Sequence, residues 1–213
     1  MKTLNMSPNN SKGYLFTFCG LDGCGKTTML TKLKEELESN YKVFLTKQPT
    51  DAVRKSDIFR TYMDCPNHDA YDYRSLSLLA ASDRLQHINK VIKPQMENGN
   101  IVISDRYFYS CLANLRARGF NEDNWIYEVA EFVVKPDVSF FFDVPVESAV
   151  KRVRSRENEK DRYIDMELQY RLRDEYIAIC KANNGILIST EMPIEECYTK
   201  VKSEVERVIK NEY

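Results

Sequence analysis

The sequence predicts a doubly wound α/β domain, with helices on both faces of a parallel sheet. Two observations support this fold class. Five short apolar runs rich in β-branched and aromatic residues recur along the chain, and a stretch long enough for a crossover helix separates each run from the next. The 213 residues, 43% of them hydrophobic, suffice for one domain with a sizeable core. The predicted strands are 14–19, 42–46, 101–104, 138–143 and 186–189.

The segments between the strands carry helical patterning. Asn98-Gly99 and Asn184-Gly185 are typical stop signals for two of the helices, and the polar stretch 63–69 predicts a loop over one end of the sheet. No repeat or linker divides the chain, so we expect a flexible tail over 1–13 and a single domain over 14–213. The predicted helices are 26–39, 71–98, 121–134, 146–157, 165–183 and 193–210.

Composition excludes several classes of protein. Lys and Arg total 31 against 32 Asp and Glu, so the net charge of -1 gives no reason to expect a nucleic-acid or membrane partner. No apolar run approaches the roughly 20 residues of a membrane span, and the first residues lack the apolar core of a signal peptide, so we expect a cytoplasmic protein. The six cysteines form no CxxC pair, which predicts reduced thiols with neither a zinc site nor a disulfide framework.

A glycine-rich motif follows the first predicted strand directly. Residues 20–27 read GLDGCGKT and fit G-x-x-x-x-G-K-[ST], with a strand before the motif and a helix behind it. Gly20, Gly23 and Gly25 let backbone amides turn toward phosphate oxygens, and the helix presents its positive end to the same anion. Lys26 would bridge the β- and γ-phosphates, and the Thr27 hydroxyl would bind Mg²⁺. The motif therefore predicts a P-loop for a Mg²⁺-bound nucleoside triphosphate, with Cys24 and Thr28 also lying around the phosphates.

The third predicted strand ends in Asp105-Arg106-Tyr107, at the sheet edge where α/β proteins bind ligands. Asp105 is suited to ordering the Mg²⁺ water shell or an acceptor oxygen, and Arg106 to holding an acceptor phosphate, with Tyr107 beside them as an acceptor contact. The alternative is that Asp105 caps the next helix while Arg106 pairs at the surface.

Two further basic features indicate ligand contacts. Arg84 shares one face of its predicted helix with Leu76 and Ala80, and a cation on an apolar face needs either a ligand or a core carboxylate. A basic run at about 151–163 is similar to a mobile lid over transferring phosphates, although the acidic residues within it are equally compatible with a solvated face. The run contains Lys151, Arg152, Arg154, Arg156, Lys160 and Arg162.

These pieces, in this order, resemble the thymidylate kinase family from about Leu15 to the C-terminus. The landmarks are GLDGCGKTT at 20–28, TKQPT at 46–50 where the family often has T-R-E-P, LLAASDRLQH at 78–87, SDRY at 104–107, and DRY at 161–163 closing the lid. The resemblance implies a P-loop kinase fold with a five-stranded parallel sheet, a homodimer, ATP with Mg²⁺ as donor, and thymidine monophosphate as acceptor.

The resemblance also implies roles for single residues. Because Gly23 stands where some relatives carry an arginine, the lid would supply the catalytic cation, which makes Lys26, Asp105 and Arg156 (or a neighbour of Arg156) the expected catalytic residues. The remaining roles are Asp22 at the acceptor sugar, Pro49 as a pocket wall, Arg84 at the base carbonyl, Arg106 at the acceptor phosphate, and Arg152 near adenine.

Departures from the family pattern concern the base pocket and leave the acceptor open. Ala80 replaces a phenylalanine that stacks on thymine, and Asn114-Leu115 replace an aromatic pair such as Tyr-Gln, while Lys47-Gln48 and Ile164 also differ. Losing the stack would weaken acceptor binding by about 1 kcal/mol unless Tyr71, Tyr73, Tyr107, Phe108 or Tyr109 fills the space. Three interpretations therefore stand: a thymidylate kinase, a related kinase for another nucleotide or nucleoside, and a non-catalytic nucleotide-binding paralogue.

Overall fold

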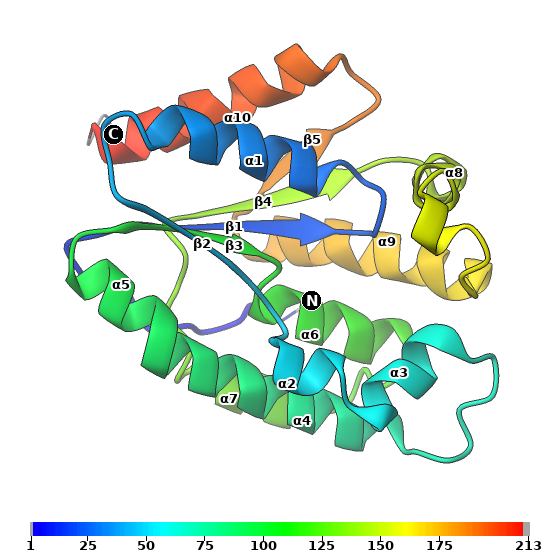
Figure 1. Cartoon of the computed structure of the whole chain (residues 1–213). Coiled ribbons are helices and arrows are strands. Elements are labelled where there is room, and N and C mark those ends of the chain that lie inside the picture. Colours follow the sequence, from blue (N-terminus) through cyan, green and yellow to red (C-terminus); the bar gives the residue numbers. More distant parts are fainter. Residues whose placement is uncertain (1, 211–213) are drawn as a thin grey trace.

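The computed structural model describes residues 2–210 and contains a five-stranded, all-parallel sheet in the order β2-β3-β1-β4-β5 (Figure 1). All five predicted strands are confirmed, with ends displaced by at most one residue. The central strand β1 pairs with β3 on one side and β4 on the other, so its carboxyl end opens onto the middle of the sheet edge. The strands are β1 (Leu15–Gly20), β2 (Val43–Lys47), β3 (Ile101–Asp105), β4 (Val138–Asp143) and β5 (Ile186–Ser189).

Helices cover both faces of the sheet. Figure 1 shows α1 and α10 on one face and α9, α6 and α4 on the other, as expected for the predicted fold class. The α-helices are α1 (Lys26–Leu37), α2 (Asp51–Arg54), α3 (Asp57–Asp64), α4 (Tyr73–His87), α5 (Lys93–Glu97), α6 (Phe108–Ala117), α7 (Trp125–Ala130), α8 (Val146–Arg154), α9 (Met166–Ala182) and α10 (Ile194–Ile209).

The core lies on both faces of the central strands, because a parallel sheet covered on both sides buries every residue of its inner strands. All six residues of β1 are buried, and Phe18 packs against Phe140 of β4 at 5.2 Å between ring centroids. Buried polar side chains in these strands are hydrogen-bonded internally: the Thr17 hydroxyl, for example, donates to Ser139 at 3.1 Å. Apolar packing thus fixes the strands whose carboxyl ends carry the predicted motifs.

The long helix predicted over 71–98 is divided in the structure. A π-helical turn over Ile88–Ile92 separates α4 from α5, and Pro94 occupies the first turn of α5. Proline lacks a backbone N–H and clashes with the carbonyl four residues earlier, so a widened turn before it is the physical reason for the break. The helices α2, α3 and α6 were not predicted: α2 and α3 are short, and most of α6 is buried, which hides the helical period.

The N-terminal residues that we expected to be flexible pack on the domain. Leu4 and Met6 are buried, and Ser7 forms a parallel bridge with Val134. The Leu4 amide also donates to the Asn183 side chain at 3.0 Å. Burial of the two apolar side chains explains why this segment packs on the domain.

Residues 211–213 of the predicted domain lie outside the described residues. Within residues 2–210, no helix has the length and apolar character needed to cross a bilayer.

Candidate active site

The P-loop connects β1 to α1 through residues 20–25. Gly20 and Gly23 have φ values of 137° and 82°, in the region that favours glycine. A Cβ at Gly23 would approach the Ala149 carbonyl oxygen to 2.2 Å, so the loop leaves no space for a side chain there. The first turn of α1 has no side-chain cap, which leaves its amides directed at the loop. The loop therefore has the backbone geometry that a phosphate cradle would require.

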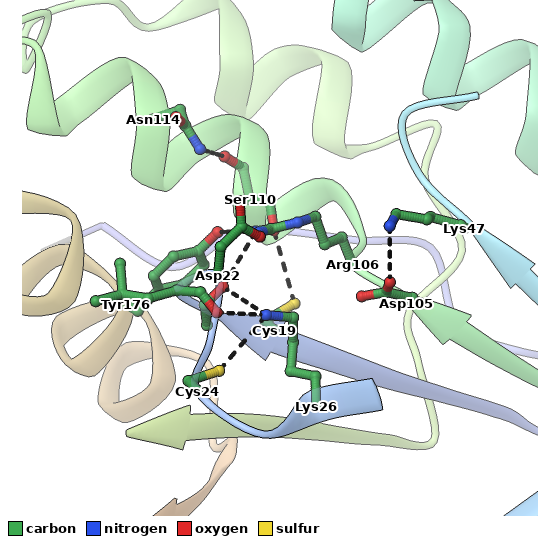
Figure 2. Close-up of polar contacts among 12 residues, drawn as sticks. Cys19, Asp22, Cys24, Lys26, Lys47, Asp105, Arg106, Ser110, Asn114 and Tyr176 are labelled. Atoms are coloured by element: carbon green, nitrogen blue, oxygen red, sulfur yellow. Dashed lines mark hydrogen bonds and ion pairs between the residues drawn. The ribbon is translucent and has the colours of Figure 1, made fainter. Parts of the chain in front are cut away.

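Lys26 lies under this loop, with only 6% of its surface exposed. Its ammonium group donates to the carbonyl oxygens of Gly20 (3.1 Å) and Leu21 (2.6 Å) and contacts the Cys24 sulfur at 3.5 Å (Figure 2). These three contacts use all three donors of the ammonium group. A phosphate bound in the loop would have to compete with them for Lys26.

Arg106 lies at the centre of the site, immediately after β3. Its φ of 68° is in the left-handed region, a strain of about 1–3 kcal/mol for a non-glycine residue. The guanidinium donates to the Gly20 carbonyl (3.1 Å), the Tyr176 hydroxyl (2.9 Å) and the Asp22 carboxylate (2.6 Å) (Figure 2). The strained turn thus connects the third strand to the P-loop. The alternative that Arg106 pairs at the surface is wrong, because its side chain is only 18% exposed.

Asp22 stands between two arginines. Arg106 binds one carboxylate oxygen, and Arg162 of the lid binds the other at 3.2 Å. Burial opposes ionisation of Asp22, but Arg106, Lys26 and Arg162 outweigh it and hold the pKa of this carboxyl well below its usual value. The side chain is nevertheless 40% exposed, so an ionised carboxylate faces the open part of the site.

Asp105 and Thr27 are the residues predicted to serve Mg²⁺. Asp105 pairs with Phe18 of β1 in the sheet register, which places it at the same edge as the P-loop, and Thr27 begins α1 beside Lys26. One Asp105 oxygen binds Lys47 at 3.2 Å, while the other is buried and has no hydrogen-bond partner among the described residues. The first turn of α6 has no side-chain cap, so the alternative that Asp105 caps this helix is wrong.

A cavity of about 590 Å³ opens beside this centre, between α4, α6, the segment that carries α2 and α3, and the lid. Several residues that we predicted to contact the acceptor or the transferring phosphoryl group line this cavity: Asp22, Pro49, Arg84, Arg106 and Arg156. Lys26, Thr27, Thr28 and Asp105 are not among its lining residues. The structure therefore separates a P-loop side from a cavity side, with Arg106 and Asp22 between them.

Tyr107 and Arg152 also lie outside the cavity. Tyr107 is fully buried and its hydroxyl donates to the Val134 carbonyl at 2.7 Å, because the residue points into the core behind the strand end. Arg152 binds the side chain and carbonyl of Thr190 at 3.2 and 3.0 Å, and Thr190 is also the side chain nearest to Gly25. Arg152 thus lies on the P-loop side.

Arg84 is 4% exposed and lines the cavity. It donates to the Ala80 carbonyl at 3.0 Å. Within residues 2–210, its buried Nε has no hydrogen-bond partner and no carboxylate lies within 4 Å of the guanidinium. The alternative of a core ion pair is therefore wrong for the described part of the chain. A buried, unneutralised guanidinium is expensive unless a ligand supplies acceptors.

Tyr73 lines the cavity. Of the five aromatic residues that could replace the phenylalanine missing at position 80, it alone does so. Phe108 and Tyr109 are buried outside it, like Tyr107, and Tyr71 is exposed. Tyr62 and His68 line it as well and were not predicted.

We predicted no specific role for Arg162 or Tyr176 from the sequence. Tyr176 accepts from Arg106 and donates to the Ser110 hydroxyl at 3.0 Å, and burial raises its pKa, so it stays a neutral partner. In the sequence Tyr176 is one apolar position of a helix, and nothing distinguishes it from a core residue. Arg162 is one cation of a run, and only the fold shows that it reaches Asp22.

A glycine cradle on a parallel sheet, a lysine beneath it and an adjoining cavity lined by arginines define a P-loop phosphotransferase. A family model described as thymidylate kinase matches residues 18–201. The chain is 36% identical over 200 residues to a probable thymidylate kinase of Thermococcus kodakarensis, covering 91% of this chain and 97% of that protein. It is 37% identical over 207 residues to a thymidylate kinase of Mycoplasma capricolum subsp. capricolum, covering 92% and 96%. The chain belongs to the thymidylate kinase family, which confirms the resemblance.

Proposed function

We propose that this protein transfers the γ-phosphoryl group of Mg²⁺-bound ATP to thymidine monophosphate, giving ADP and thymidine diphosphate. The observation that carries the proposal is the position of Arg106, whose guanidinium contacts the P-loop carbonyl of Gly20 and the cavity residue Asp22 at once. A phosphate bound by Arg106 would therefore lie next to the triphosphate loop. Family membership supports the same reaction.

On the donor side, the loop amides around Gly20, Gly23, Cys24 and Gly25 and the start of α1 would hold the phosphates, with Lys26 neutralising charge that develops during transfer. Mg²⁺ bound with ATP would neutralise the β- and γ-oxygens, and Thr27 and Asp105 would hold it. The buried, unpartnered oxygen of Asp105 fits this role, and Mg²⁺ usually binds through one or two protein groups plus substrate phosphates.

On the acceptor side, Arg106 would bind the phosphate, Asp22 the sugar and Arg84 a base carbonyl, against the wall formed by Pro49. Tyr176 acts as a positioning residue, because it fixes one edge of the Arg106 guanidinium. All four of these acceptor residues line the cavity, which supports the assignment.

The lid offers two arginines to the cavity, Arg156 and Arg162. We propose that Arg156, exposed and without an ion pair within residues 2–210, stabilises the transferring phosphoryl group, while Arg162 fastens the lid to Asp22. Arg156→Ala is expected to lower kcat at least 100-fold, since such arginines contribute about 10³–10⁵ in kcat. Arg162→Ala is expected chiefly to raise the acceptor KM, by about tenfold.

Steady-state kinetics of both variants check this division, with Arg154→Ala as the matched control because Arg154 is an exposed arginine of α8 that does not line the cavity. Equal losses in kcat for Arg154→Ala and Arg156→Ala would show that the lid acts only through its total charge.

Acceptor choice depends on the space beside Ala80. Wild-type protein is expected to prefer thymidine monophosphate over the deoxyuridine, deoxycytidine and deoxyguanosine monophosphates. Ala80→Phe is expected to tighten thymidine monophosphate binding several-fold, because a stacked aromatic pair contributes about 0.5–1.5 kcal/mol. The specificity constants of this panel test both statements. Another base ahead of thymine would favour a related kinase, and unchanged binding in Ala80→Phe would mean that residue 80 does not face the ring.

We also propose that the protein acts as a homodimer, as the family resemblance implies. Leu78 and Leu79 of α4 are 51% and 41% exposed, and Phe132 is 67% exposed. Such side chains are candidates for burial against a second copy.

A further inference from the structure

The cavity continues along α4 beyond the position expected to bind the base carbonyl. Arg84, Ala80, Ser77 and Tyr73 all line it, and a helix rises about 1.5 Å per residue, so the lining extends for about 16 Å along α4. Opposite Ser77, Cys111 of α6 approaches to 3.6 Å between oxygen and sulfur. The middle of this stretch therefore has the small side chains of Ala80, Ser77 and Cys111 beside Leu76.

The far end of the stretch is formed by Arg118 and aromatic rings. The Arg118 guanidinium lies over the Tyr73 ring at 4.1 Å and is fixed by the Asn114 side chain at 2.9 Å. Tyr62 meets Tyr73 edge-on at 5.1 Å. Arg118, Asn114, Tyr73 and Tyr62 all line the cavity. We call these four residues the remote end.

The remote end has hydrogen-bond donors without acceptors among residues 2–210. Within residues 2–210, Arg118 has no carboxylate within 4 Å, and its hydrogen bonds go only to the side chain and carbonyl of Asn114. The Tyr73 hydroxyl has no hydrogen-bond partner among the same residues. Burial raises the pKa of Tyr73 to about 12, against the opposing effect of Arg118 and Arg84, so this hydroxyl is a neutral donor. Arg84 and Arg118, which have no carboxylate partner within residues 2–210, thus line the same cavity.

Thymine satisfies only one of them. Its ring carbonyl suits Arg84, but its methyl group offers nothing to a guanidinium, and C5 adjoins the carbonyl carbon C4, so a substituent on C5 projects from the same side of the ring. We infer that the remote end is a second recognition point of the acceptor pocket, which binds an oxygen-bearing substituent on C5 of a pyrimidine nucleoside monophosphate through Arg118. This inference rests on the proposed function of the pocket.

A purely structural role for Arg118 is the competing explanation. It follows the last residue of α6, where a cation stabilises the helix end, and it stacks on an aromatic ring. Arg74 makes a similar contact, 4.4 Å over Phe120, but it has a carboxylate partner in Asp123 and does not line the cavity. Arg74 therefore offers a matched control for an arginine that only supports structure.

The test compares three acceptors in the full-length protein: thymidine monophosphate and deoxyuridine monophosphates that carry a carboxyethyl or an isopentyl group on C5. The two substituents have the same number of heavy atoms, and only one bears an anion. We expect wild-type kcat/KM to be at least tenfold higher for the carboxyethyl acceptor than for the isopentyl acceptor. Arg118→Met, which keeps the stem, is expected to remove this preference, and Arg74→Met to retain it.

The outcomes separate the inference from the proposed function. Equal use of the two substituted acceptors by the wild type, or an equal loss on all three acceptors in Arg118→Met, would overturn the recognition role and leave a structural one. Absence of turnover with thymidine monophosphate itself would instead refute the proposed function. Isothermal titration of the same acceptors gives a readout independent of turnover, in which Arg118→Met should weaken only the carboxyethyl compound, by about tenfold.

Discussion

Lys26→Ala is expected to lower kcat by about 100- to 1,000-fold, the loss typical when one preorganised donor to a developing charge is removed. The ammonium group is the one cation within the P-loop, and its position beneath the Gly20 and Leu21 carbonyls keeps it within the phosphate cradle. The fold should survive, because the apolar packing of β1 and α1 does not involve the ammonium group. Steady-state kinetics with ATP and thymidine monophosphate give the measurement.

The control for this variant is Lys32→Ala, on the same helix, where Lys32 forms an exposed ion pair with Glu195. Exposed pairs contribute at most about 1 kcal/mol to stability, so near-normal turnover is expected for the control. Circular dichroism and thermal melting must show that both variants are folded. A folded Lys26→Ala protein with near-normal kcat would refute the proposed role of the P-loop in phosphoryl transfer.

Arg106→Ala is expected to lower kcat/KM for the acceptor by about 10- to 150-fold while the Kd of ATP changes less than twofold. Charge-assisted contacts to a phosphate contribute about 1.5–3 kcal/mol, and Arg106 is the arginine that joins the P-loop to the cavity. The melting temperature should also fall, since Asp22 and Tyr176 lose a partner.

Arg116→Ala is the matched control. Arg116 pairs with Glu175 and so links α6, which begins shortly after Arg106, to α9, which carries Tyr176. Arg116 does not line the cavity. Its acceptor kinetics should stay near wild type. If ATP affinity falls in Arg106→Ala and the acceptor KM does not rise, the residue belongs to the donor side.

The sequence predicted the sheet and the P-loop because both depend on local signals. Buried parallel strands are continuous apolar runs, and the glycines at 20, 23 and 25 have fixed spacing. The helix α6 lacked such a signal, since its burial on most sides removes the helical period. The π-turn before Pro94 was missed for another reason, because the helical pattern continues on both sides of it.

Within the site, the sequence predicted residues that follow strands or belong to motifs, and five of them line the cavity. It did not predict contacts between distant segments. Arg162 and Asp22 are 140 positions apart, and Tyr176 and Arg106 are 70 apart, so only the fold brings them together. Tyr107 shows the converse: its place in a motif suggested a ligand, but the backbone turn directs it into the core.

We expect γ-phosphoryl transfer to occur at the junction of the P-loop and the Arg106 cavity. The most direct test supplies ATP labelled at the γ-phosphoryl group, with Mg²⁺, and follows the label with and without thymidine monophosphate. We expect labelled thymidine diphosphate to form at a rate equal to ADP release, with almost no ADP release when the acceptor is absent. Release of labelled inorganic phosphate at the same rate whether or not the acceptor is present would contradict transfer to thymidine monophosphate.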